Sequence, residues 1–221
     1  MDNNIIEIKN YSKRIKEYLI LNHINLNIQK GKCYGFIGRN GSGKSMLFKA
    51  ICGLIKSTKG YIKVNNKIVG KEVDFPDNVG MLIEYPGFLY DYSGFNNLKY
   101  LAAINNKISE QQIIDTMTLM ELDYKSKKPV KKYSLGMKQR LGIAQAIMED
   151  PSIIILDEPM NGLDRNGVVL VRKIIQKLKQ EGKTILLASH NSTDIELLCD
   201  KVFEMNNGTL ESFDGTNIHE G

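Results

Sequence analysis

The chain contains 221 residues, of which 42% are hydrophobic and 25% are charged, a composition typical of one globular domain with a single buried core. Its formal net charge of +5 comes from dispersed basic residues, and the densest group, at 125–132, is interpreted as a solvated loop, so we expect no nucleic-acid partner. The longest apolar runs fall far short of the roughly 20 residues that cross a bilayer, which argues against a membrane-spanning protein.

The cysteines and the first residues indicate a cytoplasmic protein. Cys33, Cys52 and Cys199 are an odd number and form no CxxC motif, so we expect neither a disulfide framework nor a zinc site. Residues 1–10 open with an acid and two asparagines and lack the basic-then-apolar layout of a secretory signal.

Short β-branched runs recur along the chain and predict strands. These runs are 5–8, 24–28, 34–37, 79–83, 153–156, 184–188 and 202–205. Helical periods lie between several of them, clearest at 168–178, where Gly182 is expected to close the helix. The alternation of strands and helices predicts an α/β fold with a largely parallel, buried sheet.

The stretch 86–150 differs from its surroundings because it offers helical patterns and almost no strand signal. The patterns lie at 95–103, 109–122 and 136–148. We interpret the stretch as a helical lobe inserted into a single domain, 1–221, whose core comprises about 1–85 and 151–211.

Residues 38–45 read GRNGSGKS and satisfy the P-loop pattern, between a predicted strand and a predicted helix. The glycines allow successive N–H groups to point at phosphate, and the helix N-terminus adds partial positive charge. Lys44 can reach the β- and γ-phosphates, and Ser45 can offer its hydroxyl to Mg²⁺. The expected nucleotide-binding residues are Gly38, Arg39, Asn40, Gly41, Ser42, Gly43, Lys44, Ser45 and Met46.

Chemistry-bearing side chains follow two other predicted strands. Asp157 and Glu158 end the strand at 153–156, and His190 follows the strand at 184–188. Because strand C-termini line the crevice of an open α/β sheet, we expect Asp157 in the Mg²⁺ shell and Glu158 as the base for the attacking water. His190 is expected at the γ-phosphate, although a lone histidine is more often structural.

Residues 133–141, YSLGMKQRL, resemble the signature segment of the ABC ATPase family, and the resemblance extends over about 5–208. It implies a P-loop NTPase fold with a RecA-like core, an antiparallel β subdomain and an inserted α-helical subdomain. It also implies ATP and Mg²⁺ as cofactors, ATP hydrolysis, and two chains that sandwich ATP head to tail. Ser134 and Gly136 of the signature and Asp164 of the D-loop would then complete the partner's nucleotide site, with Ser134 as a helix N-cap.

The match to the family departs from its common form in three places. The Q-loop glutamine falls on Glu84, which is therefore expected as a metal ligand and catalytic group. The adenine-stacking aromatic aligns with Ile15, with Tyr11 and Tyr18 nearby. The signature keeps its serine and second glycine but is changed at Tyr133, Leu135 and Met137.

The Glu84 and signature variants together resemble the bacitracin-transport and lantibiotic-immunity branch of exporters. This implies a homodimer or heterodimer that drives a separate membrane permease from the inner face of the cell membrane. Permease contact is expected at Tyr85, Phe88, Leu89 and Tyr90, whose other interpretation is lobe core. Three alternatives stay open: an importer subunit, a nucleotide sensor without hydrolysis, and an ABC ATPase acting on nucleic acid or ribosomes.

Overall fold

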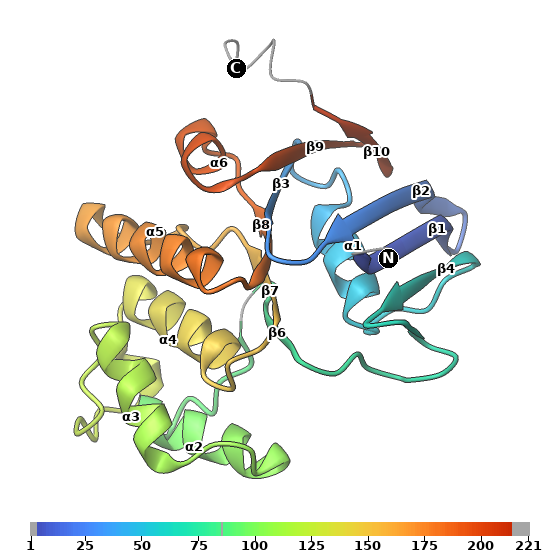
Figure 1. Cartoon of the computed structure of the whole chain (residues 1–221). Coiled ribbons are helices and arrows are strands. Elements are labelled where there is room, and N and C mark those ends of the chain that lie inside the picture. Colours follow the sequence, from blue (N-terminus) through green and yellow to red (C-terminus); the bar gives the residue numbers. More distant parts are fainter. Residues whose placement is uncertain (1–3, 85, 214–221) are drawn as a thin grey trace.

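A six-stranded sheet lies at the centre of the fold, in a computed structural model that describes residues 4–84 and 86–213 (Figure 1). Its strand order is β10-β9-β3-β8-β7-β6. The strands are β3 (Cys33–Ile37), β6 (Val79–Leu82), β7 (Ile153–Asp157), β8 (Thr184–Ala188), β9 (Lys201–Asn206) and β10 (Thr209–Ser212). All neighbours pair in parallel except β9 and β10, and β7 and β8 are buried along their whole length, which confirms the predicted parallel, buried sheet.

A second sheet is antiparallel, with strand order β2-β1-β4-β5. Its strands are β1 (Asn4–Ile15), β2 (Tyr18–Gln29), β4 (Lys59–Val64) and β5 (Lys67–Ile68). In β2, buried Ile24, Leu26 and Ile28 alternate with exposed polar residues, so the sheet buries one face and leaves the other in solvent. The runs predicted at 5–8 and 24–28 lie inside these longer strands.

Helix α1 (Lys44–Ile51) packs between the two sheets, where it begins directly after the P-loop (Figure 1). Leu47, Phe48 and Ile51 are completely buried in a cluster that joins residues of both sheets. The Phe48 ring meets Phe36 of β3 edge to face, with 5.2 Å between the ring centroids. This contact packs the middle of α1 against the end of β3.

Helices α2 (Gly94–Asn105), α3 (Glu110–Leu119) and α4 (Leu135–Ile147) lie between β6 and β7, where periodicity predicts helices. A short 3₁₀ turn, Val130–Lys132, precedes α4. Serines cap all these α-helices at their N-termini: Ser93, Ser109 and Ser134. Their apolar faces share one buried cluster with β7 and β8, so α4 is anchored to the sheet that carries the site.

Helix α5 (Arg165–Gln180) follows β7, and the short helix α6 (Ser192–Leu198) follows β8. Gly182, with a φ of +80°, comes just after the cap residue of α5, as the predicted helix end requires. Cys33, Cys52 and Cys199 are free thiols. Within the described ranges, no helix combines the length and the apolar character needed to cross a membrane.

Candidate functional site

The C-terminal ends of neighbouring parallel strands bring the predicted site residues together. Phe36 of β3 pairs with Ala188 of β8, Ala188 pairs with Asp157 of β7, and Leu156 pairs with Leu82 of β6. Because these register positions lie at one edge of the sheet, the P-loop, the two acids, Glu84 and His190 all emerge there.

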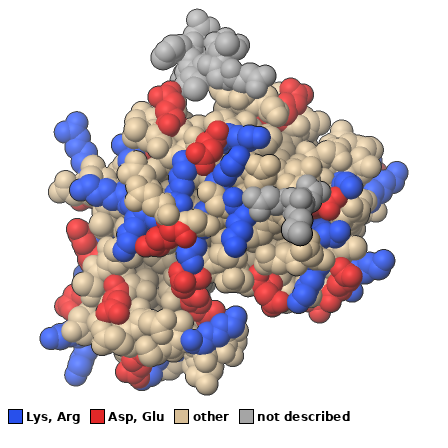
Figure 2. Space-filling view, in the orientation of Figure 1, with Lys and Arg blue, Asp and Glu red and all other residues tan. Residues whose placement is uncertain are grey.

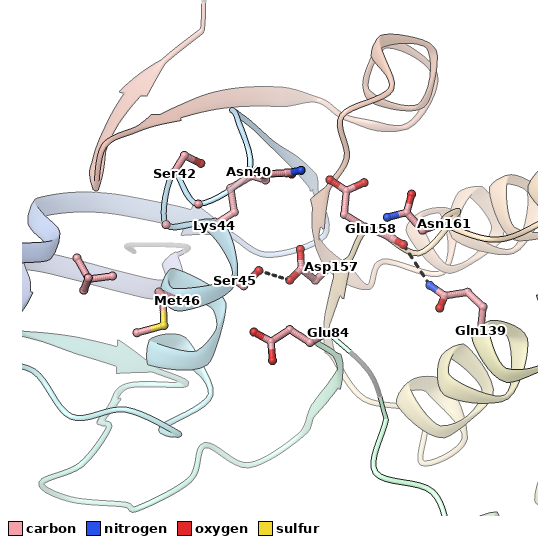
Figure 3. Close-up of a pocket in the computed structure, with 13 residues that line it drawn as sticks. Asn40, Ser42, Lys44, Ser45, Met46, Glu84, Gln139, Asp157, Glu158 and Asn161 are labelled. Atoms are coloured by element: carbon pink, nitrogen blue, oxygen red, sulfur yellow. Dashed lines mark hydrogen bonds between the residues drawn. The ribbon is translucent and has the colours of Figure 1, made fainter. Parts of the chain in front are cut away.

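A pocket of about 450 Å³ opens at this edge (Figure 3). Residues from the P-loop, the start of α1 and the ends of β6 and β7 line it together with single residues of β2 and α4. The lining residues are Ile20, Asn40, Gly41, Ser42, Gly43, Lys44, Ser45, Met46, Glu84, Gln139, Asp157, Glu158 and Asn161. Gly38, Arg39 and His190 line an adjoining hollow instead.

The P-loop wraps the start of α1 and leaves the first turn of the helix without a side-chain cap. Gly43 precedes the helix with a φ of +116°, and no side chain caps the first turn. The buried Ser42 hydroxyl has no hydrogen-bond partner, although buried polar atoms normally have one. A Cβ atom on Gly38 would lie 2.2 Å from the Met205 carbonyl oxygen, so this turn requires glycine. Such a cradle fits a phosphate group.

Lys44 folds back over this cradle. Its Nζ donates to the carbonyl oxygens of Gly38 at 2.7 Å and Arg39 at 3.3 Å, and the residue is only 7% exposed. The ammonium group is thus held beside the loop that would receive phosphate. A bound phosphate can replace these carbonyl contacts with stronger charge-assisted ones.

Ser45 and Asp157 offer oxygen atoms side by side, with the Ser45 hydroxyl donating to Asp157 Oδ2 at 2.5 Å (Figure 3). Burial raises the pKa of Asp157, while the Ser45 hydrogen bond and the Lys44 charge oppose that shift. Hard cations such as Mg²⁺ favour carboxylate and hydroxyl oxygens supplemented by substrate phosphates and water. The donor set therefore fits Mg²⁺.

Glu84 lies just after β6 with a φ of +57°, in the left-handed region. Its carboxylate forms an ion pair with Lys49 of α1, at 2.6 Å between Nζ and Oε1, and its negative charge contributes to raising the pKa of Asp157. Lys49 therefore compensates part of a charge that the usual glutamine would not carry.

We expect ATPase activity to depend more steeply on magnesium in the wild type than in Glu84→Gln, because the carboxylate adds negative charge near the metal. Magnesium titrations of the two proteins measure this. Glu181→Gln, which removes an exposed carboxylate paired with Lys177 at the end of α5, should leave the curve unchanged. Superimposable curves for wild type and Glu84→Gln would mean that Glu84 does not act at the metal.

Glu158 is aimed into the pocket by its backbone, which has a φ of +51°. Its N–H donates to the Ala188 carbonyl oxygen at 3.0 Å, and its carbonyl oxygen accepts from Gln139 Nε2 at 3.1 Å. Its Oε2 lies 2.8 Å from His190 Nδ1, so the predicted base and the predicted histidine are in direct contact. The His190 side chain is 66% exposed.

Gln139, Ile20 and Asn161 are pocket residues that sequence reasoning missed. Gln139 is 8% exposed and reaches the site from α4, three residues after Gly136 and therefore on the same face of the helix. That spacing is a signal that could have identified it. Ile20 reaches the pocket from β2, and no sequence pattern points to it.

The expected adenine-stacking residues do not line the pocket. Tyr11 is 3% exposed and its hydroxyl donates to the Ile55 carbonyl oxygen at 3.2 Å, so it is a core residue. Tyr18 is 74% exposed and Ile15 is 44% exposed. Among the described residues, Ile20 rather than an aromatic side chain stands at this side of the pocket.

Ser134, Gly136 and Asp164, the residues assigned to the partner's site, lie outside the pocket lining. Ser134 caps α4 by accepting from Met137 N at 3.2 Å, as its position predicts. Asp164 caps α5 by accepting from Gly167 N at 2.8 Å. A Cβ atom on Gly136 would lie 3.2 Å from the Gly162 carbonyl oxygen, so the two segments pack closely.

The parallel sheet, the phosphate cradle and the Ser45–Asp157 pair define a P-loop nucleotide-binding protein. The sequence model of the family described as "ABC transporter" matches residues 21–161. The chain therefore belongs to the ABC transporter family of ATP-binding proteins, which bind and hydrolyse ATP.

Curated relatives resemble the chain over most of its length. An uncharacterized ABC transporter ATP-binding protein, YybJ of Bacillus subtilis, is 44% identical, over 94% of this chain and 95% of YybJ. The bacitracin transport ATP-binding protein BcrA of Enterococcus faecalis is 38% identical, over 93% of this chain and 68% of BcrA. The lantibiotic transport ATP-binding protein SrtF of Streptococcus pyogenes is 38% identical, over 98% of this chain and 95% of SrtF.

The fold matches that of MJ0796, a bacterial ABC transporter cassette solved as a dimer. The TM-score is 0.85 over 95% of this chain and 99% of that chain, at 23% sequence identity. This agreement confirms the expected combination of a P-loop NTPase core with antiparallel strands and helices between β6 and β7.

Proposed function

We propose that the chain drives export of a peptide antibiotic or a similar substrate through a separate membrane permease, using Mg²⁺-dependent ATP hydrolysis. The observation that carries this proposal is the 38% identity to BcrA and SrtF, whose names state bacitracin and lantibiotic transport. The pocket supports ATP hydrolysis because it brings together the P-loop, the Ser45 and Asp157 oxygens and Glu158. An importer subunit remains the alternative.

In this proposal the P-loop N–H groups and Lys44 bind the β- and γ-phosphates. Ser45 and Asp157 hold Mg²⁺, which when bound neutralises charge on the phosphates during transfer. Glu84 contributes a further carboxylate whose charge Lys49 moderates. The unpartnered Ser42 hydroxyl supports the binding step, because a phosphate oxygen would satisfy it.

Glu158 accepts the proton of the attacking water, and His190 holds the carboxylate and contacts the γ-phosphate. The 2.8 Å contact between the two side chains supports this arrangement. Gln139 Nε2 donates to the carbonyl oxygen of Glu158 and so fixes the backbone of the base. Through this bond, α4 of the helical lobe contacts the base directly.

We further propose that two chains, identical or related, sandwich ATP head to tail. Ser134 and Gly136 at the start of α4 and Asp164 at the start of α5 would meet the nucleotide of the partner. Their position outside the pocket of their own chain supports this role, as does Leu135, which is 54% exposed beside them.

The permease surface that the sequence suggested needs correction. Phe88 is 7% exposed and belongs to the buried cluster that α2, α3 and α4 share with β7 and β8, so its assignment to docking is wrong. Tyr85 lies outside the described residues. Leu89 and Tyr90 are each 49% exposed, close in sequence to the site residue Glu84, and we propose that they contact the permease.

On the face drawn in Figure 2, the charge pattern supports a protein partner rather than nucleic acid. Figure 2 shows Lys and Arg side chains interspersed with Asp and Glu over the face drawn, without a continuous basic stripe. Nucleic-acid surfaces normally gather basic side chains on one face or along one helix.

We expect Leu89→Asp to abolish copurification of the permease with the tagged chain, because a buried charge without a partner disrupts an apolar contact. The same variant should fail to restore resistance to envelope-acting peptide antibiotics in a strain lacking the gene. The measurements are permease recovery by affinity purification and growth inhibition across a panel of such antibiotics.

Leu197→Asp is the matched control, because Leu197 is 53% exposed on α6 and should tolerate the charge. Permease recovery with folded, ATP-binding Leu89→Asp would overturn the docking surface. Wild-type antibiotic sensitivity in the deletion strain would overturn antibiotic export and favour another exporter or an importer.

A further inference from the structure

A buried ion pair joins α5 to α6 behind the site. The guanidinium of Arg172 contacts Asp194 Oδ1 through Nη2 at 2.6 Å and through Nε at 2.7 Å. The Asp194 side chain is 2% exposed, so its charge requires this partner. The pair is therefore a fixed point between the two helices.

The other oxygen of Asp194 anchors the turn that carries His190. The buried Ser189 hydroxyl donates to Asp194 Oδ2 at 3.2 Å and accepts from the Asn191 N–H at 3.1 Å. Asn191 in turn caps α6 by accepting from Asp194 N at 3.3 Å. Both residues that flank His190 are thus tied to Asp194.

His190 has little packing of its own to hold it in place. Its side chain is 66% exposed, and its contacts with Glu158 are the 2.8 Å side-chain contact and a 3.4 Å bond from its backbone N–H. The backbone on either side of His190 therefore sets the direction of its ring. The bonds of Ser189 and Asn191 hold that backbone in place.

We propose that Arg172, Asp194 and Ser189 are positioning residues that hold His190 against Glu158. The proposal rests on the proposed function, in which His190 and Glu158 act on ATP. The network has a second attachment, because α5 begins at the cap residue Asp164 of the D-loop. A shift of that helix would move Arg172 and, through Asp194, the turn that carries His190.

We expect Ser189→Ala and Arg172→Gln to lower kcat on the order of 10-fold to 100-fold, because a displacement of about 1 Å in a catalytic group has effects of that size. The KM for ATP should change by less than about twofold, since the P-loop is untouched. Arg172→Lys keeps the charge and should retain more activity than Arg172→Gln. Phosphate release measures activity, and thermal melting measures folding. If Arg172→Gln does not fold, Ser189→Ala decides the test, because it changes no charge.

Lys179→Gln is the matched control. Lys179 lies on the same helix and pairs with Asp200 at 2.7 Å, beyond the far end of α6 from His190. Its loss removes a more exposed ion pair and a hydrogen bond to the Leu198 carbonyl oxygen at the end of α6, without touching the turn, so kcat should stay at the wild-type value. A loss of kcat in Lys179→Gln equal to that in Arg172→Gln would overturn the proposal, because the effect would then not be specific to the Arg172–Asp194 ion pair.

The decisive comparison adds Ser189→Ala to His190→Ala and measures single-turnover phosphate release. If Ser189 acts through His190, the second substitution has no further effect. A further loss equal to that in the wild-type background would overturn the positioning role. If His190→Ala alone loses turnover while Ser189→Ala does not, the network proposal fails and the proposed function stands. If His190→Ala keeps full turnover, the role of His190 in the proposed function fails.

Discussion

Glu158→Gln should reduce ATP turnover by about 10²- to 10⁴-fold, the range associated with loss of a general base, while ATP still binds. Glutamine preserves the size and polarity of the side chain but cannot accept the proton. Because the nucleotide persists, dimers should accumulate. Phosphate release gives the rate, and gel filtration with ATP and Mg²⁺ gives the dimer fraction.

Glu149→Gln serves as the control for this result, since Glu149 follows α4, accepts a hydrogen bond from Asn105 and lies outside the nucleotide pocket. It should turn over ATP normally and should not accumulate dimers. Wild-type turnover in Glu158→Gln would exclude Glu158 as the base and direct attention to Glu84, the other carboxylate that lines the pocket beside Asp157.

Lys44→Ala should weaken ATP binding roughly tenfold to a hundredfold, since each lost charge-assisted hydrogen bond contributes about 1.5–3 kcal/mol. Hydrolysis should fall to background, because the γ-phosphate loses the cation that positions it. Fluorescent-nucleotide titration measures the affinity and phosphate release measures the rate.

Lys183→Ala tests whether the loss of any partly buried lysine would have this effect. Lys183 has a side chain that is 14% exposed and donates to the Asp150 carbonyl oxygen at 3.1 Å, before β8 and away from the pocket. It should bind ATP as the wild type does. Unchanged affinity and turnover in Lys44→Ala would contradict the P-loop assignment.

The strands that the sequence predicts well are those buried on both faces. β7 and β8 are continuous apolar runs, and such runs carry a strong signal without alternation. β4, β5 and β10 went unpredicted because exposed positions with polar or charged residues break their apolar pattern. α6 has only seven residues, too few for a helical period to emerge.

The pocket was predictable wherever a side chain follows a strand directly, because parallel register brings strand ends together. Contacts between segments distant in sequence were not predictable. Lys49 and Glu84 are 35 residues apart, and Gln139 and Glu158, whose carbonyl oxygen it contacts, are 19 residues apart. Burial of Phe88 likewise depends on the packing of the cluster that α2, α3 and α4 share with β7 and β8. The catalytic and metal-binding roles, the trans contacts and the division at 86–150 stay predictions.

The left-handed backbone at Glu158 has a cost that falls on the stability of the whole chain. A residue with a Cβ atom loses about 1–2 kcal/mol in this conformation, a substantial part of the about 5–15 kcal/mol that separates folded from unfolded domains. Glycine would relieve the strain but has no carboxylate. With Glu158 as the proposed base, thermal robustness and ATP hydrolysis compete at this position.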